Sequence, residues 1–134
     1  MATRGRIGLL LDDGSIRSVY SHWDNYPEGT GKILTDKFNT KEKVEELIAG
    51  GDISCLETDT DWKGNRRKET FTLYYKDRGD LDCGFLISEN DADYFKLTRN
   101  CDGEFAYLFD PNTQTWECFN MHSAVSVPIP GDTQ

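Results

Sequence analysis

The sequence predicts an α+β domain: an antiparallel sheet of about six strands, built from hairpins, with two or three helices packed on one face. Alternating polar and apolar segments flank short turn sequences, as in hairpins, and other segments repeat apolar residues at helical spacing. The 134 residues, with seven Phe, six Tyr and three Trp, suit one domain with a hydrophobic core. We expect this domain to span residues 1–127, followed by a flexible tail at 128–134 that contains proline and glycine.

The first expected hairpin joins strands at 6–11 and 16–22. Asp13 and Gly14 suit the two central positions of a type I′ turn, because both positions need a positive φ. A two-residue turn would pair residues whose numbers sum to 27, and it would direct the mostly apolar side to the core. The side chains then expected on the opposite, exposed side are Arg4, Arg6, Arg17 and Trp23.

Two helices are expected to follow, one over 32–38 and a second that begins at an Asn39 cap and ends at Gly50-Gly51. The apolar residues expected to face the core are Ile33, Leu34, Phe38, Val44, Leu47 and Ile48.

Beyond these helices, the polar segment 52–68 is expected to be an irregular, exposed connection. The remaining expected elements are a strand at 69–75 paired with one at 81–88, a helix at 90–99 capped by Asn90, and a hairpin of strands 105–110 and 115–120 with Phe105, Tyr107, Phe109, Trp116 and Cys118 on one face.

Charge and composition narrow the classes of partner. The net charge of −9, mostly carried by residues 51–134, opposes general binding to nucleic-acid backbones. No apolar run is long enough to span a bilayer and no signal peptide is recognisable, so we expect no membrane partner and a location in the host cytoplasm. The four cysteines lack a C-x-x-C pair, and we expect neither a metal nor a cofactor. The oligomeric state stays open, and a homodimer is compatible with the sequence.

The arginine-rich face is the first candidate site. Guanidinium groups bind phosphates and carboxylates through paired hydrogen bonds, and indole rings stack on bases or on arginine. The residues expected to bind an anionic ligand are Arg4, Arg6, Arg17, Trp23, Tyr26, Gly29, Gly31 and Lys32, with the glycine amides as extra donors. The competing interpretation is that carboxylates of later strands pair with these arginines, and that Gly29 and Gly31 only make a flexible helix entry.

Acidic residues form a second candidate surface, which would dock on a basic patch of a host protein. Its members are Asp77, Asp80, Asp82, Asp91 and Asp93. The competing interpretation is that these charges only keep the protein in solution.

A third candidate pairs His22 with Asp24, as general-base catalysis would need. The expected register places His22 opposite Gly5 on the core side, where a histidine held by Asp24 would be structural. No serine or cysteine nucleophile is placed nearby by a local motif. We therefore expect no enzyme, with a small His/Asp hydrolase as the alternative.

Several short motifs resemble a family of small, uncharacterised proteins of tailed phages and some bacteria. They are Thr3-Arg4, Asp13-Gly-Ser15, Tyr20-Ser-His-Trp-Asp24, Tyr26-Pro27, Gly29, Gly31, Lys43-Val44, Leu47-Ile48, Gly51-Asp52-Ile53-Ser54, the turn Tyr75-Lys-Asp-Arg-Gly79, and Tyr107-Leu-Phe109 before Trp116. The resemblance is dense over residues 3–56. This chain departs from the pattern at Gly5 and Cys55, where serine is usual, and at Asn25, where glycine is usual. The resemblance implies a phage origin more than a mechanism.

The resulting hypothesis is a non-enzymatic phage accessory protein that binds an anionic small molecule, such as a host nucleotide signal, and so counters a host defence. The alternative from the interaction class is an acidic inhibitor of a host protein.

Overall fold

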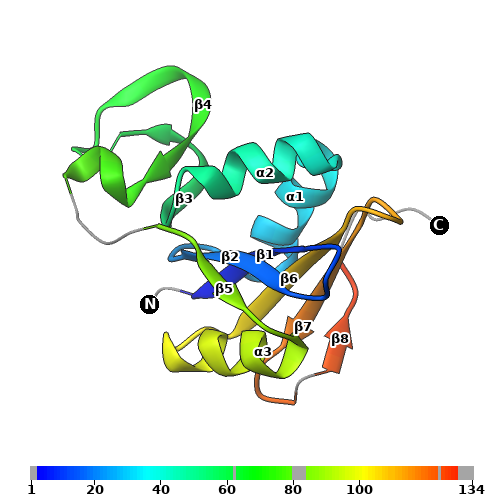
Figure 1. The fold of residues 1–134 in the computed structure, drawn as a ribbon. Helices are drawn as coiled ribbons and strands as arrows, with labels where there is room; N and C mark the ends of the chain where they lie inside the picture. Colours follow the sequence, from blue (N-terminus) through cyan, green and yellow to red (C-terminus); the bar gives the residue numbers. More distant parts are fainter. Residues whose placement is uncertain (1–2, 62, 80–83, 124, 130–134) are drawn as a thin grey trace.

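The strands form a mixed sheet with one outlying strand (Figure 1). The computed structural model describes residues 3–61, 63–79, 84–123 and 125–129. The strand order is β4-β3-β2-β1-β6-β7-β8, and β5 pairs with β2. The strands are β1 (Gly5–Leu10), β2 (Ile16–Ser21), β3 (Ile53–Thr60), β4 (Arg66–Tyr74), β5 (Leu86–Ser88), β6 (Phe105–Asp110), β7 (Thr115–Asn120) and β8 (Val125–Val127). The α+β class is confirmed, but the expected all-antiparallel sheet is not, because β1 pairs with β6 and β2 with β3 in parallel.

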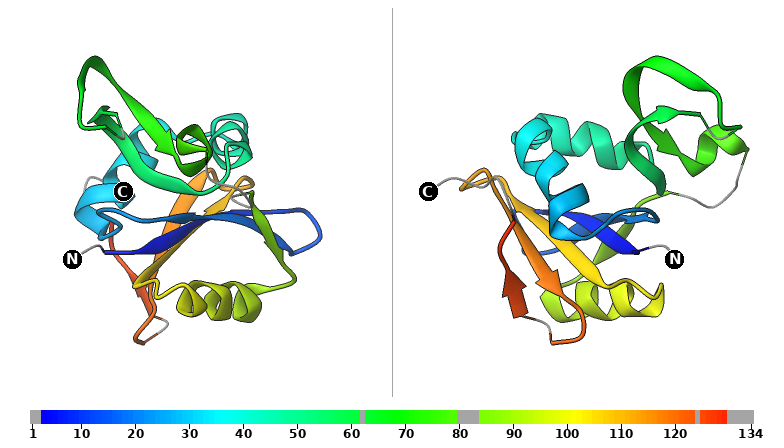
Figure 2. Two further views of the ribbon diagram at one scale, coloured as in Figure 1. Left: turned by 90° about the vertical axis from the view of Figure 1, so that its left-hand side faces the viewer. Right: turned by 180° about the vertical axis from the view of Figure 1, so that it is seen from behind.

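Helices cover both faces of this sheet (Figures 1 and 2). α1 (Lys32–Lys37) and α2 (Lys41–Ala49) lie on one face, and α3 (Asp91–Asn100) lies on the other. The prediction that all helices share one face is therefore wrong. Gly8 explains how α3 approaches β1, since a Cβ at this position would lie 3.0 Å from the hydroxyl of Tyr94.

Two hydrophobic clusters fill the space between these layers. The larger one lies beneath α1 and α2 and includes Ile7, Leu9, Val19, Val44 and Phe109. The smaller one lies beneath α3 and consists of Ile16, Tyr94, Ala106 and Met121. The apolar residues expected on the first two helices are confirmed as part of the larger cluster or packed against it.

The first hairpin has a different register from the expected one. Paired residues sum to 26, as in the pair of Leu10 with Ile16, so the loop contains three residues rather than two. The Asp13 carboxylate accepts hydrogen bonds from the amide and the hydroxyl of Ser15, and Gly14 has a φ of 88°. A type I turn followed by a left-handed glycine makes this three-residue loop. Because a shift of one residue on one strand exchanges its two faces, the predicted grouping of side chains on β2 is reversed relative to β1.

The β6–β7 hairpin has the expected register. Phe109 pairs with Trp116 and Tyr107 with Cys118, and these four side chains are buried in the larger cluster. The indole Nε1 of Trp116 also donates a 2.7 Å hydrogen bond to the carbonyl of Phe38. This bond ties the segment between α1 and α2 to the sheet.

The capping residues were predicted for one helix and missed for another. Asn90 caps α3, as expected, by accepting a hydrogen bond from the amide of Asp93. The cap of α2 is Thr40 rather than Asn39, because the Thr40 hydroxyl accepts the amide of Lys43. Gly51, with a φ of 86°, follows the end of α2.

The segment expected to be an irregular connection is mostly β-structure. β3 and β4 form a hairpin that projects away from the rest of the sheet (Figure 1). Its register shifts several times, and Glu57 has a positive φ, which accounts for the lack of a regular sequence alternation. β4 therefore pairs with β3 and not with residues 81–88, whose last part forms β5 against β2.

The outer edge of β2 is divided between two strands. β5 covers Ile16 to Ser18, and β3 pairs with Ser21. Between them, the amide of Tyr20 donates a 2.9 Å hydrogen bond to the carboxylate of Asp52 instead of to a strand. Within the segment expected to be a tail, Ile129 is buried against the larger cluster. Residues 130–134 lie outside the described residues.

Candidate functional site

Two of the expected site arginines lie on opposite faces of the sheet. Arg6 is only 3% exposed, and its guanidinium donates to the hydroxyl and the carbonyl of Ser18, each at 3.0 Å. Arg17 pairs with Leu9 on the face covered by α1 and α2, and its guanidinium stacks on the ring of Phe85 at 4.6 Å. The predicted cluster of three arginines with Trp23 is therefore not formed, because it depended on the two-residue turn.

Aromatic side chains gather where β2 ends. We call Tyr20, His22, Trp23 and Tyr75 the aromatic cluster. The ring of His22 contacts Trp23 edge-on at 4.8 Å between centroids and lies 6.5 Å from Tyr75. Tyr20 and Tyr75 stack at 6.5 Å with 26° between their planes. Trp23 is 41% exposed, so the cluster offers an aromatic surface to solvent.

The tautomer of His22 follows from its contact with Tyr20. The Tyr20 hydroxyl lies 2.6 Å from Nδ1 of His22. Burial raises the pKa of Tyr20 to about 12, so the hydroxyl keeps its proton and acts as the donor. Burial, and then the charge of Arg4, lower the pKa of His22 below its usual 6.5, so the ring is neutral at pH 7. Neutral imidazole that accepts at Nδ1 carries its proton on Nε2 and can donate from there.

Arg4 supplies positive charge beside this cluster. It lowers the pKa of His22, and it also acts on the pKa of Tyr20 in the lowering direction, against the larger effect of burial. Its ion pair is with Asp102 at 3.4 Å, where the carboxylate side chain is 82% exposed. The Nε atom of Arg4 is buried and has no hydrogen-bond partner among the described residues. The guanidinium is thus only weakly neutralised within the protein.

The glycine segment does not present its amides as expected. Pro27–Gly31 forms a single π-helical turn before α1, in which the amide of Gly29 donates to the carbonyl of Tyr26 at 2.9 Å. Gly31 is buried, and a Cβ there would lie 3.2 Å from the Tyr107 hydroxyl. The short distances account for both glycines by packing. Tyr26 and Lys32 are exposed.

Asp24 does not hold the histidine as expected. Among the described residues the hydrogen-bond partner of the His22 ring is Tyr20, and the residue packed against Gly5 is Asn25 rather than His22. Asn25 donates to the carbonyls of Thr3 and Ser21, and a Cβ on Gly5 would lie 3.1 Å from its Cβ. Gly5 and Asn25, where the chain departs from the phage-protein pattern, are thus neighbours in one packing arrangement.

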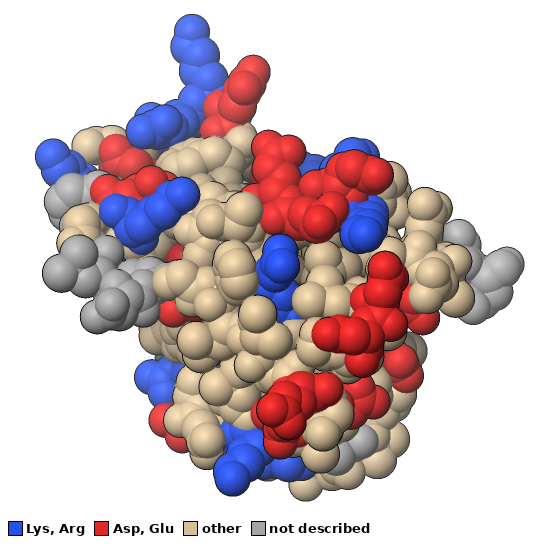
Figure 3. Space-filling model, in the orientation of Figure 1, with Lys and Arg blue, Asp and Glu red and all other residues tan. Residues whose placement is uncertain are grey.

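The expected acidic surface is divided. Asp77 belongs to a 3₁₀ turn, Tyr75–Arg78, after β4, whereas Asp91 and Asp93 lie in the first turn of α3. Asp80 and Asp82 fall outside the described residues. On the face drawn in Figure 3, acidic side chains form separate groups, one over α2 and another near α3.

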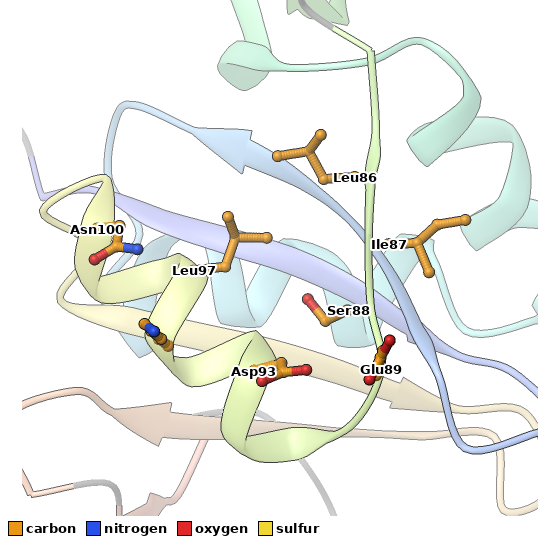
Figure 4. Close-up of a pocket in the computed structure, with 8 residues that line it drawn as sticks. Leu86, Ile87, Ser88, Glu89, Asp93, Leu97 and Asn100 are labelled. Atoms are coloured by element: carbon orange, nitrogen blue, oxygen red, sulfur yellow. The ribbon is translucent and has the colours of Figure 1, made fainter.

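A groove that the sequence reasoning missed runs between β5 and α3 (Figure 4). Its volume is about 490 Å³, and it is lined by Leu86, Ile87, Ser88, Glu89, Asp93, Lys96, Leu97 and Asn100. We call it the β5–α3 groove. Three consecutive apolar residues, Phe85 to Ile87, are exposed here. This run was the available signal, but it was assigned to a strand paired with residues 69–75.

Other classes of site have less support in the described part of the chain. It contains no group of three or more His, Cys, Asp or Glu side chains placed to hold a metal ion. Cys55, Cys101 and Cys118 are free thiols, and burial raises the pKa of each of them. No helix within the described ranges has both the length and the apolar character needed to cross a membrane.

Comparison with known proteins gives no relative from which to transfer a function: no family model, curated protein or solved structure matches the chain.

Proposed function

We propose that the protein is a non-enzymatic binding protein for a small anionic molecule with a planar ring, such as a nucleotide, which it holds at the aromatic cluster and Arg4. The observation that carries this proposal is the state of Arg4. Its buried Nε has no hydrogen-bond partner in the described chain, and its ion pair is long and exposed. A phosphate or carboxylate would provide the acceptors that this guanidinium lacks.

The surrounding groups suit the two parts of such a ligand. The exposed indole of Trp23 offers a stacking surface for a base, worth about 1–3 kcal/mol in comparable sites. The Nε2–H group of neutral His22 would donate a hydrogen bond, and it adds no charge at pH 7. The site therefore combines one cation, one neutral donor and a stacking surface.

The biological setting of the proposal comes from the resemblance to phage proteins. A phage accessory protein that sequesters a nucleotide signal in the host cytoplasm would lower the free concentration of that signal and so counter a host defence. Sequestration needs binding without turnover, which fits a histidine whose Nδ1 is engaged by a tyrosine rather than by a carboxylate.

Isothermal titration calorimetry with a panel of mononucleotides and cyclic dinucleotides tests the proposal. Adenosine and inorganic phosphate are included as the separate parts of such a ligand. We expect heat of binding for at least one nucleotide and much weaker binding for either part alone. Arg4→Gln and Trp23→Ala should each weaken the binding about tenfold or more, the loss expected for one charge-assisted contact or one stacked base.

Arg17→Gln is the matched control, because Arg17 lies on the other face of the sheet and its substitution should leave the affinity unchanged. The absence of heat with every compound at high micromolar concentration would contradict the proposal. So would binding that Arg17→Gln weakens as much as Arg4→Gln.

A further inference from the structure

The β5–α3 groove has an apolar middle that no other part of the described chain covers. Leu86 is 48% exposed, and in Figure 4 the side chain of Leu97 points from α3 toward β5. Ser88 forms part of the lining between them. Exposed apolar residues that line a concave surface are typical of a site that another molecule covers.

The backbone of β5 also has an open edge. In the first hairpin the amide of Leu11 donates to the carbonyl of Ser15, and the hydrogen-bonded pairs of an antiparallel ladder alternate from there. This alternation directs the backbone groups of Ile16 and Ser18 toward β5, where they face Ser88 and Leu86. The amide and carbonyl of Ile87 are then directed to the opposite side, where no other described strand pairs with β5. An extended peptide can add to such an edge as a further strand.

One end of the groove is acidic. The carboxylates of Glu89 and Asp93 point toward one another across the gap between β5 and α3 (Figure 4). Neither forms an ion pair with a described residue, and Lys96, which also lines the groove, forms none with them. Two unneutralised carboxylates on a protein of net charge −9 favour a cationic partner group.

We propose that the β5–α3 groove is a docking site for an extended segment of another protein that places an apolar side chain between Leu86 and Leu97 and a nearby Lys or Arg at Glu89 and Asp93. The backbone of the segment adds to the open edge of β5 at Ile87. This surface is separate from the aromatic cluster, and it gives the protein a peptide partner in addition to a small-molecule ligand.

Selection of linear twelve-residue peptides from a random displayed library on the full-length protein tests this proposal. We expect enrichment of peptides with an apolar residue and a Lys or Arg within two or three positions of it. Affinity of a synthesised enriched peptide is then measured by fluorescence anisotropy. Leu86→Gln should weaken its binding at least about tenfold, because the lost apolar burial is large. The double variant Glu89→Gln/Asp93→Asn should weaken it about fivefold, and less so at high salt.

Asp77→Asn is the charge control, because Asp77 lies after β4 and its substitution should leave the affinity unchanged. Leu86 is the main test position because its exposed side chain can change without loss of the core, and Leu97→Ser is a second variant at the facing wall. Failure to enrich a shared motif, enrichment without basic residues, or unchanged binding by both leucine variants would each overturn the proposal. A concentration-dependent dimer that Leu86→Gln dissociates would also overturn it, because a second copy of the chain would then be the occupant.

Discussion

The hydroxyl of Tyr20 lies 2.6 Å from Nδ1 of His22, and this contact sets which nitrogen of the imidazole carries the proton. We predict that the neutral ring of the wild-type protein is almost entirely the Nε2–H tautomer. Tyr20→Phe removes the donor and should bring back a mixture of the two tautomers. The ¹⁵N chemical shifts of the imidazole measure the ratio. Equal ratios in both proteins would show that the hydrogen bond does not control the tautomer.

The influence of Arg4 on His22 can be tested by titration. The positive charge of Arg4 contributes to the lowered pKa of His22, after the larger contribution of burial. Arg4→Gln should therefore raise the pKa of His22 toward 6.5 without reaching it, whereas Arg17→Gln should leave it unchanged. NMR titration of the imidazole protons gives both values. A His22 pKa that does not move in Arg4→Gln would place the guanidinium farther from the ring than the structure has it.

The same lowered pKa predicts a pH dependence of stability. Between pH 6.5 and the lower folded-state pKa, the unfolded chain binds more protons at His22 than the folded chain does. The contribution of His22 to the free energy of unfolding is therefore fully present above pH 6.5 and falls as the pH is lowered through this window. Urea unfolding at pH 7.5 and pH 5.5 should show a smaller loss of stability in His22→Asn than in the wild type. A larger loss in the variant would reverse the predicted sign.

The cap of α2 gives a test of the observed helix boundary. Thr40→Ala removes the oxygen that accepts the amide of Lys43 and should lower the free energy of unfolding by about 1 kcal/mol. Asn39→Ala, at the position expected from the sequence, should change it by less than about 0.5 kcal/mol. Chemical denaturation of both variants decides between the two positions, since the opposite order of effects would restore the sequence-based assignment.

Close packing at Gly5 gives a fourth stability prediction. A Cβ there would lie 2.5 Å from the carbonyl oxygen of Phe105 on β6. Gly5→Ala should lower the free energy of unfolding by about 1–3 kcal/mol, the usual cost of forcing an extra carbon into a packed site. Gly84→Ala, where no atom lies within 4 Å of the added carbon, is the control and should cost less than about 0.5 kcal/mol. Thermal unfolding of the two variants makes the comparison.

The fold could be predicted wherever neighbouring residues decide the structure. The register of the β6–β7 hairpin and the Asn90 cap depend on short segments whose preferences agree with the final structure. The first hairpin could not be predicted to the residue, because the Asp13 side chain and Gly14 stabilise a loop one residue longer than the Asp-Gly pair suggests. That one residue was enough to invalidate the predicted arginine cluster.

Non-local contacts decided the rest. Nothing near Arg6 in the sequence indicates that Ser18 would be its partner, or that β5 would pair with β2 instead of with the strand that precedes it. The candidate site was predicted in part: Arg4 and Trp23 remain at an exposed position, but Tyr75 joins them from a turn more than fifty residues away. The β5–α3 groove likewise needs two elements whose arrangement the sequence alone does not specify.

The placement of helices on both faces of the sheet has a consequence for how the protein can recognise other molecules. With its two broad surfaces already occupied, the sheet can meet visitors only around its perimeter, at the finish of β2 beside Trp23 and along the outer strand at Ile87. Binding there asks for no rearrangement of either hydrophobic layer, so the folded protein should receive its partners with an interior that stays as rigid as before.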